Sequence, residues 1–185
     1  MTSLETIAHD IRACTLCPLA RSRTNAVPGE GPASARLMFV GEAPGQAEDA
    51  QGRPFVGRAG QVLNQALLFA GIERSEVFIT NVVKCRPPNN RVPTKNEIDS
   101  CITAHLHRQI QSIEPEIICL LGGTAVKALL GVDRLEAVRG RIIIIEKNRK
   151  YFVTYHPAGA GRNPAWHEAF QGDLKKLNAL LTNKG

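Results

Sequence analysis

Residues able to bind a ligand follow or end three apolar segments that are spread along the chain. They are Gly41-Glu42-Ala43-Pro44-Gly45 after residues 36–40, Asn81 within residues 77–83, and His156-Pro157 after residues 151–154. The carboxyl ends of parallel strands meet at one edge of a sheet, and open sheets bind ligands beyond that edge. If the three segments are such strands, a turn that exposes backbone, an amide and an imidazole converge there. The pattern therefore predicts a ligand site at this edge.

Each of these residues also fits a structural role when it is considered alone. The glycine turn needs no ligand, Asn81 can bond to backbone inside a sheet, and His156 stands before a proline. Phe55 lies in the polar, glycine-flanked segment Gly52–Gly57, where its ring either packs into the core or offers a platform for a base. The convergence is stronger evidence for a site than any single residue.

Four cysteines form a second set of reactive residues. Cys14 and Cys17 have the C-x2-C spacing that lets two thiolates reach one metal centre, Cys85 follows the second apolar segment, and Cys101 lies in a predicted helix. Four thiolates can hold zinc or a [4Fe–4S] cluster, and the spacing does not distinguish these. Buried or reactive thiols are the alternative. Cys119, inside an apolar segment, is expected to act as a small buried hydrophobe.

Apolar periodicity and helix caps predict strands that alternate with helices. The predicted strands are residues 36–40, 77–83, 116–121, 142–145 and 151–154. The predicted helices run from the Ser3 cap to Ala13, from Gly60 to Ala70, from the capping box Thr94-Lys95-Asn96-Glu97 to Ile113, over residues 124–130, and from Pro164 to about Leu181. This order indicates an α/β sandwich around a mainly parallel sheet, in which residues 142–145 fit an antiparallel or edge strand. Residues 1–185 are expected to form a single domain.

Composition limits the functional classes. The 185 residues carry a net charge of +6 and a pI near 9.3, which suits a polyanionic partner but is also found in soluble basic proteins. No stretch approaches the ~20 apolar residues of a membrane span, and the N-terminus does not resemble a signal peptide. We therefore expect an intracellular, cytoplasmic protein without membrane partners. In such a reducing compartment the five cysteines are more typical of metal ligands or buried thiols than of disulfides.

Four motifs, taken with the four cysteines, resemble the family 4 uracil-DNA glycosylases. In chain order they are Gly41-Glu42-Ala43-Pro44-Gly45 followed by Glu48-Asp49, Gly52-Arg53-Pro54-Phe55-Val56-Gly57-Arg58-Ala59-Gly60, Thr80-Asn81-Val82-Val83-Lys84-Cys85-Arg86-Pro87-Pro88, and Tyr155-His156-Pro157-Ala158. The match runs from Cys14 to about Pro164. The resemblance implies a base excision repair enzyme that flips uracil out of DNA and hydrolyses its N-glycosidic bond, leaving an abasic site and free uracil.

The resemblance also implies a fold, a cofactor and site residues. The fold is α/β, a three-layer sandwich around a central, mainly parallel four-stranded sheet. The cofactor is a [4Fe–4S] cluster that is mainly structural and ties the N-terminal segment to the loops near DNA. Its implied ligands are Cys14, Cys17, Cys85 and Cys101, and the implied uracil pocket consists of Gly41, Glu42, Ala43, Phe55, Asn81 and His156.

Each implied role has a physical reason. A stacked base must be extruded before it can be attacked, and Phe55 can then lie against its face. Asn81 offers a donor to uracil O4 and an acceptor to N3–H, whereas cytosine would leave buried groups unpaired. His156 can donate to O2 as negative charge develops there. Glu42 can stabilise the sugar cation or orient water, a task that Glu48 or Asp49 could share.

The chain departs from the family pattern after its last motif. Residues 158–162, Ala-Gly-Ala-Gly-Arg, lack the large apolar residue that the family commonly has there. Either Arg162 enters the duplex, or substrates in which flipping costs less are preferred; we expect U·G mismatches and single strands to be preferred over U·A pairs. The expected DNA-backbone contacts are Lys84, Arg86 and Arg162, with Arg58 and Arg91 close to the motifs, although each also fits a solvated basic surface.

Three other functions fit parts of the sequence. A relative that traps the sugar covalently through a histidine has a basic, histidine-containing insertion after the Asn motif, whereas residues 89–93 are short and lack histidine. A metal-stapled DNA-binding module would use the same basic surface without catalysis. A nucleotide-binding protein could use Gly122-Gly123-Thr124, which lacks the full glycine-rich fingerprint and the P-loop Lys-Ser/Thr pair. We expect a monomer.

Overall fold

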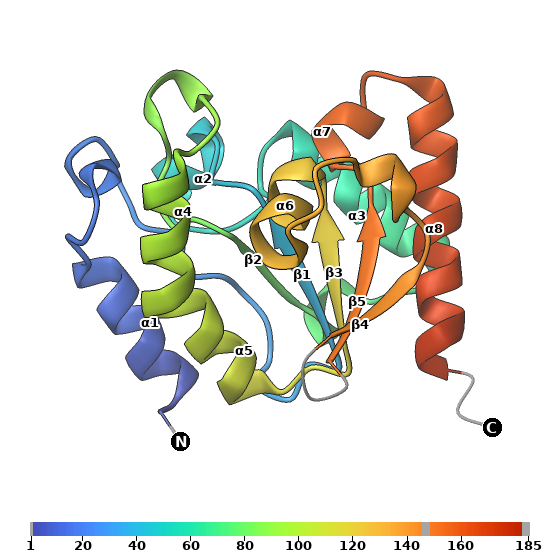
Figure 1. Ribbon diagram of the computed structural model, residues 1–185, viewed down its shortest axis with the longest axis horizontal. Coiled ribbons are helices and arrows are strands. Elements are labelled where there is room, and N and C mark those ends of the chain that lie inside the picture. The colour runs from blue at the N-terminus through green and yellow to red at the C-terminus, as the bar shows by residue number, and fades with distance from the viewer. Residues whose placement is uncertain (1, 146–148, 183–185) are drawn as a thin grey trace.

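The computed structural model describes residues 2–145 and 149–182, which fold around a five-stranded sheet (Figure 1). The strands are β1 (Leu37–Gly41), β2 (Phe78–Asn81), β3 (Ile117–Leu121), β4 (Ile142–Ile145) and β5 (Arg149–Thr154), in the order β2-β1-β3-β5-β4. The first three and β5 are parallel, as expected, and β4 is antiparallel to β5 at the edge. The expected four-stranded sheet is thus the parallel part of a sheet of five.

Helices cover both faces of the sheet, which confirms the three-layer sandwich (Figure 1). One layer contains α3 (Arg58–Ala70) and α8 (Pro164–Thr182); the other contains α1 (Leu4–Ala13), α4 (Lys95–Cys101), α5 (His107–Ile113) and α6 (Gly123–Leu130). Side chains alternate along the strands, so that Leu37 and Phe39 pack in one apolar cluster and Met38 and Val40 in the other. All five residues of β1 are buried, as expected for a strand covered on both faces.

The helix starts agree with the capping signals in the sequence. Ser3 Oγ accepts from the Thr6 N–H at 3.1 Å, Thr94 and Glu97 form the expected reciprocal capping box, and Asn163 Oδ1 accepts from the Ala165 N–H at 3.0 Å. The helix that follows Thr94 reaches Ile113 through a π-helical turn, η4 (Ile102–Leu106). Element boundaries otherwise lie within about two residues of the prediction.

Two short helices were not predicted, and both border the edge where the motifs lie. They are α2 (Gln46–Gln51) and α7 (Pro157–Ala160). Each is too short to show a helical repeat of apolar residues. The remaining short turns are the 3-10 segments η1 (Pro18–Arg21), η2 (Arg74–Glu76), η3 (Pro88–Asn90) and η5 (Leu135–Ala137).

The carboxyl ends of the four parallel strands lead into loops and helices at a single edge, the upper edge in Figure 1. There β1 leads to α2, β3 to α6 and β5 to α7. This topology brings together segments that are more than 100 residues apart. No helix in the described part of the chain is long and apolar enough to cross a membrane.

Candidate active site

The loops at this edge enclose a cleft of about 970 Å³. The structure brings together the three groups that the sequence placed at strand ends: Glu42 and Ala43 after β1, Asn81 at the end of β2, and His156 after β5 all line the cleft. Phe55 joins them from the loop between α2 and α3. Other residues of the lining are Arg58, Asn90, Arg91, Gly159, Arg162 and Trp166.

Gly41 allows the amide of Asn81 and the ring of Phe55 to meet. Gly41 and Asn81 are paired in the β1–β2 register. A Cβ atom on residue 41 would lie 2.5 Å from Asn81 Oδ1 and 2.6 Å from Phe55 Cζ, too close for any side chain. The role of Gly41 is therefore to leave this space to Asn81 and Phe55, because a glycine has no side chain.

The side-chain oxygen of Asn81 is buried and has no hydrogen-bond partner among the described residues. An unpaired buried acceptor costs about 1–3 kcal/mol. A ligand that brings an N–H group into the cleft would satisfy it. The orphaned oxygen is thus positive evidence for a ligand, because native structures rarely leave such atoms unpaired.

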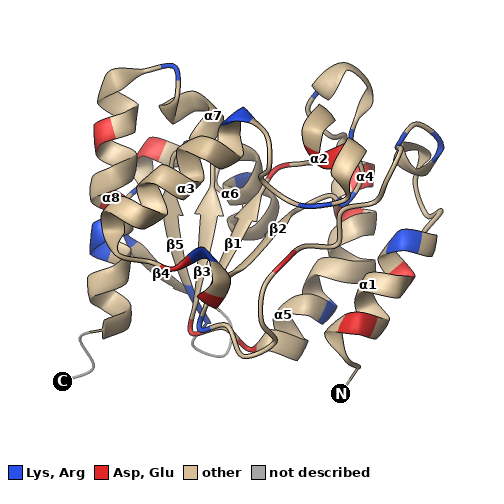
Figure 2. Cartoon of the chain, turned by 180° about the vertical axis from the view of Figure 1, so that it is seen from behind, with Lys and Arg blue, Asp and Glu red and all other residues tan. Residues whose placement is uncertain are grey.

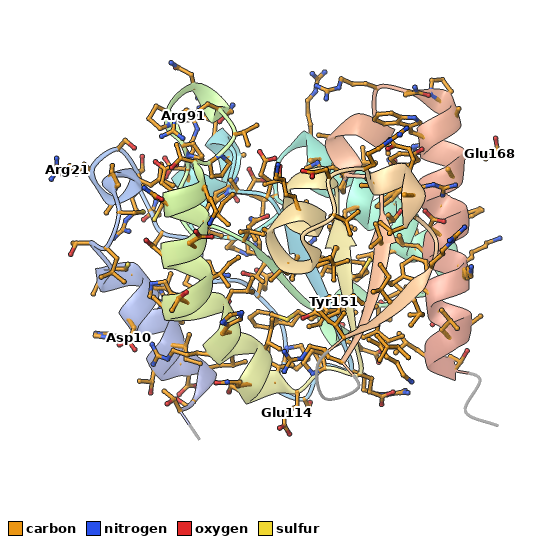
Figure 3. The ribbon with its side chains drawn as sticks, in the orientation of Figure 1. Asp10, Arg21, Arg91, Glu114, Tyr151 and Glu168 are labelled. Atoms are coloured by element: carbon orange, nitrogen blue, oxygen red, sulfur yellow. The ribbon has the colours of Figure 1, made fainter. Side chains whose placement is uncertain are left out.

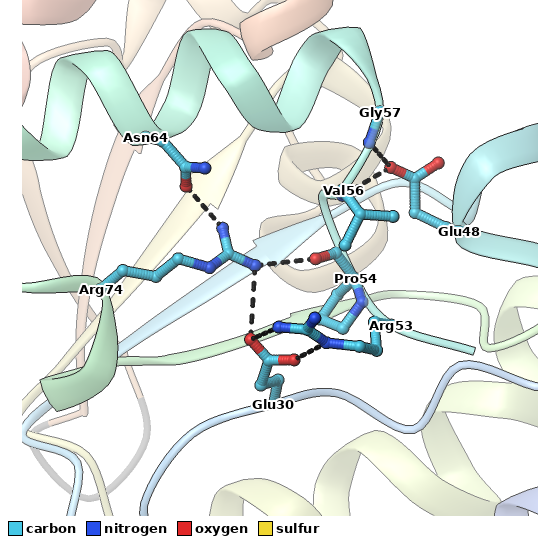
Figure 4. Close-up of polar contacts among 8 residues, drawn as sticks. All are labelled: Glu30, Glu48, Arg53, Pro54, Val56, Gly57, Asn64 and Arg74. Carbon is cyan, nitrogen blue, oxygen red and sulfur yellow. Dashed lines mark hydrogen bonds and ion pairs between the residues drawn. The ribbon is translucent and has the colours of Figure 1, made fainter. Parts of the chain in front are cut away.

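The Phe55 loop is held in a conformation that bulky residues rarely adopt. Phe55 has a φ of 50°, in the left-handed region, which costs on the order of 1–3 kcal/mol for a residue with a side chain. Glu48 Oε1 accepts from the N–H groups of Val56 at 2.9 Å and Gly57 at 2.8 Å (Figure 4). Glu48 Oε2 accepts from the Gly45 N–H at 3.1 Å, so this carboxylate joins the β1 turn to the Phe55 loop.

Asp49, like Glu48, holds a neighbouring loop through hydrogen bonds to its backbone. It is buried, and its Oδ1 accepts from the N–H groups of Thr24 at 2.9 Å and Asn25 at 3.3 Å. Glu48 lines the cleft and Asp49 does not, although both bind backbone donors, and the expectation that one of them shares the task of Glu42 stays a prediction.

His156 caps α7 with one nitrogen and keeps the other for the cleft. Its Nδ1 accepts from the Ala158 N–H at 3.2 Å, which places the proton of the neutral ring on Nε2. Burial lowers the pKa of His156 to about 4; Arg162 lowers it further and Glu48 opposes the shift. The ring centroid lies 6.0 Å from that of Phe55. The imidazole is thus a neutral hydrogen-bond donor beside the aromatic ring.

Glu42 is held by a residue whose role the sequence did not reveal. Thr124, in the first turn of α6, donates its hydroxyl hydrogen to Glu42 Oε2. The preceding Gly122 has a φ of 91° and lies against His156, where a Cβ atom would be 2.8 Å from the histidine Cβ. The segment considered above as a nucleotide-binding turn therefore supports Glu42 and His156.

One predicted DNA contact is wrong. Lys84 is 1% exposed, and its Nζ donates to Thr80 Oγ1 at 2.6 Å and to the Asn81 carbonyl at 2.7 Å. The chain turns inward after β2, so the ammonium lies beneath the site and cannot reach a DNA phosphate.

Other basic residues remain at the surface. Arg162 and Arg58 are exposed, the first between α7 and α8 and the second at the start of α3. Figure 2 shows a basic, blue segment on the connection between α7 and α8. Arg91, on the loop before α4 (Figure 3), pairs with Glu97 at 2.8 Å, and Arg86 donates to Asn90 Oδ1 at 2.8 Å. Arg58, Arg91 and Arg162 line the cleft.

A model of the uracil DNA glycosylase superfamily matches residues 28–181, which include every cleft residue described above. The chain belongs to the uracil-DNA glycosylase superfamily. It is 47% identical to the type-4 uracil-DNA glycosylase of Sulfurisphaera tokodaii, over 97% of this chain and 86% of the relative. The type-4 enzymes of Archaeoglobus fulgidus and Thermotoga maritima are 41% and 45% identical, over 100% and 98% of this chain and 96% of each relative.

These relatives place the chain with the type-4 uracil-DNA glycosylases, as the motifs predicted. A type-5 uracil-DNA glycosylase of Pyrobaculum aerophilum is less similar, at 32% identity over 71% of this chain. The family membership favours a glycosylase over the DNA-binding module and the nucleotide-binding protein considered from the sequence.

The four cysteines that were expected to bind a metal line one pocket between α1, η1 and α4: Cys14, Cys17, Cys85 and Cys101. Arg23, Lys84 and His105 line the same pocket. Arg23 Nη1 lies 3.0 Å from Cys85 Sγ, to which it donates. Burial raises the pKa of Cys85 and raises that of Cys101 to about 11. Within the described residues, no three Cys, His, Asp or Glu side chains are grouped as they would be around one metal ion.

Cys119 lies apart from these four. It is fully buried in β3, where desolvation raises the pKa of its thiol. This position agrees with the expected role of a small hydrophobe.

Replacing Gly41 by alanine should obstruct the slot without unfolding the protein. Because the new methyl group would overlap Asn81 and Phe55, we expect excision of uracil from an oligonucleotide to fall by roughly 100-fold or more. Gly123→Ala is the control at the neighbouring strand end, since a Cβ there meets nothing within 4 Å. Equal activity of Gly41→Ala and the control would show that the slot is not used.

The low pKa of His156 predicts the pH dependence of both rate and stability. With a folded pKa of about 4, the ring stays neutral through the pH range in which an ordinary histidine titrates, so excision should show no inflection near 6.5. The unfolded ring binds a proton below about pH 6.5. Native stability should therefore fall as the pH drops from about 6.5 towards 4, and fall less in His156→Asn. A rate inflection near 6.5 that His156→Asn abolishes would contradict this assignment.

Proposed function

We propose that this protein excises uracil from DNA by hydrolysing the N-glycosidic bond, which leaves an abasic site and releases uracil. The observation that carries the proposal is the unpaired, buried Oδ1 of Asn81 in a cleft shared with the Phe55 ring and a neutral His156. The type-4 uracil-DNA glycosylases that resemble this chain over nearly its full length support it.

Recognition begins with extrusion of the base, which costs a few kcal/mol. The base lies against the Phe55 ring, and Asn81 reads its edge. Uracil brings N3–H to the orphaned Oδ1 and accepts from the amide nitrogen through O4. Cytosine presents an acceptor where Oδ1 needs a donor, and a mismatch of this kind costs about 1–3 kcal/mol.

Cleavage leaves negative charge on the departing uracil. His156 Nε2–H donates to uracil O2 as this charge develops, and the ring needs no proton from solution because it acts as a neutral donor. Its position is set before substrate arrives, since Nδ1 is already bonded to the Ala158 N–H. A fixed donor costs little reorganisation when the bond breaks.

Glu42 acts on the sugar side of the bond. Its carboxylate stabilises the oxocarbenium-like sugar or orients the attacking water, as carboxylates do in glycoside hydrolysis. Thr124 holds one oxygen and leaves the other for this task. The exposed Arg58 and Arg162 at the rim supply phosphate contacts, and the preference for U·G mismatches and single strands over U·A pairs stays a prediction.

We further propose that Cys14, Cys17, Cys85 and Cys101 hold a [4Fe–4S] cluster, whose contribution is structural. The donor set fits this group, because four thiols line one pocket and cysteine thiolates are the usual ligands of such clusters. Arg23 would donate to the Cys85 thiolate, and such bonds to cluster sulfurs are usual.

The charge of Lys84 also fits an anionic group in this pocket. Its side chain is 1% exposed, and it lines the same pocket as Cys85 and Cys101. Burial lowers the pKa of Lys84 to about 8. A buried cation is costly unless it is paired. Metal-bound thiolates would provide the opposite charge, and Lys84 would hold the Asn81 carbonyl at the same time.

The proposed activity predicts a specific pattern of losses. Uracil-containing oligonucleotide is incubated with protein, and abasic sites are then cleaved with alkali. We expect Asn81→Ala and His156→Ala each to lower the rate by roughly 100-fold or more, because each removes a group that contacts the base. Binding to abasic DNA should change little. Release of cytosine from Asn81→Asp at a rate above wild type would support reading of the base edge by residue 81, and full activity of Asn81→Ala would refute it.

The proposed cluster predicts a brown protein that contains iron and sulfide and absorbs at about 400 nm. Lys84→Met should lose iron faster to a chelator, because the thiolates lose their buried counter-charge. Lys95→Met, at an exposed lysine on the same helix as Cys101, should behave as wild type. Zinc without iron in anaerobically purified protein would exclude the cluster.

A further inference from the structure

Arg74 lies outside the cleft, yet it holds the loop that carries Phe55 (Figure 4). It belongs to η2, just before β2. Its Nη1 donates to Asn64 Oδ1 on α3 at 2.8 Å, and its Nη2 donates to the Pro54 carbonyl at 2.8 Å. The same Nη2 lies 3.7 Å from Glu30 Oε1. One guanidinium thus connects α3, the Phe55 loop and the segment of Glu30.

The bonded carbonyl belongs to the residue directly before Phe55. On the other side, Glu48 accepts from the N–H groups of Val56 and Gly57, so both flanks of Phe55 are held by hydrogen bonds with side chains. Gly60, on α3, also lies against the loop: a Cβ atom on residue 60 would be 1.8 Å from the Phe55 carbonyl oxygen. The left-handed conformation of Phe55 persists because these contacts leave the loop no alternative.

Glu30 ties this arrangement to the strand of Asn81. Its N–H donates to the Ile79 carbonyl at 2.9 Å, and its carbonyl accepts from the Ile79 N–H at 2.8 Å. Ile79 stands two residues before Asn81 in β2. Glu30 and Arg74 therefore connect the Phe55 loop to β2, the strand that carries Asn81. They fix the position of the Phe55 ring relative to the Asn81 amide.

We propose that Arg74 is a positioning residue for uracil recognition, which fixes Phe55 over Asn81 before the base arrives. This proposal rests on the proposed function and extends it to a residue that touches neither base nor DNA. An aromatic platform contributes most when it need not be ordered on binding. The guanidinium suits the task because its planar fork donates from two separate nitrogens, which reach Asn64 and Pro54 at the same time, whereas a lysine has a single nitrogen.

The test is a double-mutant cycle between Arg74 and Phe55. In the wild-type background, Arg74→Met should lower kcat/KM for uracil release by roughly ten-fold, about the effect of one charge-assisted hydrogen bond. In the Phe55→Ala background the same change should lower it by less than about two-fold, because no ring remains to be positioned. Inhibition by free uracil should weaken with Arg74→Met, while affinity for abasic DNA stays unchanged.

Arg36→Met is the matched control. Arg36 likewise bonds a carboxylate and a backbone carbonyl, those of Glu116 and Leu181, but it lies at the opposite edge of the sheet. The Arg36→Met variant should be less stable than the wild type, but free uracil should inhibit it to the same extent. If Arg74→Met does not fold, Arg74→Lys enters the same cycle, because it keeps the positive charge but has one donor nitrogen in place of a fork.

The outcomes separate this proposal from the one on which it rests. Equal losses from Arg74→Met in both backgrounds would overturn it, since Arg74 would then act independently of the ring. An unchanged rate in Phe55→Ala would overturn it as well. Absence of uracil release by wild-type protein would instead refute the proposed function.

Discussion

The close approach of β1 to the Phe55 ring and to Asn81 is the constraint on which the rest of the site depends. Only a glycine at position 41 allows the amide and the ring to come this near to the strand. The strand register places Asn81 beside that glycine, and Gly60 lets the Phe55 carbonyl lie against α3. Backbone packing thus forms a narrow slot, and three side chains then define its chemistry.

Buried charged and polar groups hold the surrounding loops. Glu48 joins the β1 turn to the Phe55 loop, Asp49 fixes residues 24 and 25, and Thr124 holds Glu42. Glu48 and Asp49 are costly to bury, and their hydrogen bonds to backbone N–H groups offset that cost. The same bonds prevent the loops from relaxing around the unpaired oxygen of Asn81. This rigidity is what a preorganised catalytic site requires.

Lys84 connects the cleft with the cysteine pocket. It stands between Asn81 and Cys85 in the chain, and its ammonium bonds the Asn81 carbonyl while facing the thiols of Cys85 and Cys101. A metal centre in that pocket would therefore be connected to the backbone of Asn81 through one side chain, although it would lie away from the base. This arrangement would connect the proposed cluster to the residue that reads the base.

The amino-acid sequence by itself determined the parallel strands, the motif-bearing edge, the family and the four cysteines that share a pocket. These features depend on local patterns, such as apolar runs, helix caps and glycine turns, which can be recognised in the sequence without knowledge of the fold. The tertiary structure alone decided where individual side chains point. Lys84 resembled a DNA contact because it stands in a polar motif, but the chain turns inward after β2 and buries it. Glu48 and Thr124 lie in segments that the sequence singled out, and Arg74 does not. The roles of all three became visible only in the structure, because the folded chain brings their hydrogen-bond partners within reach.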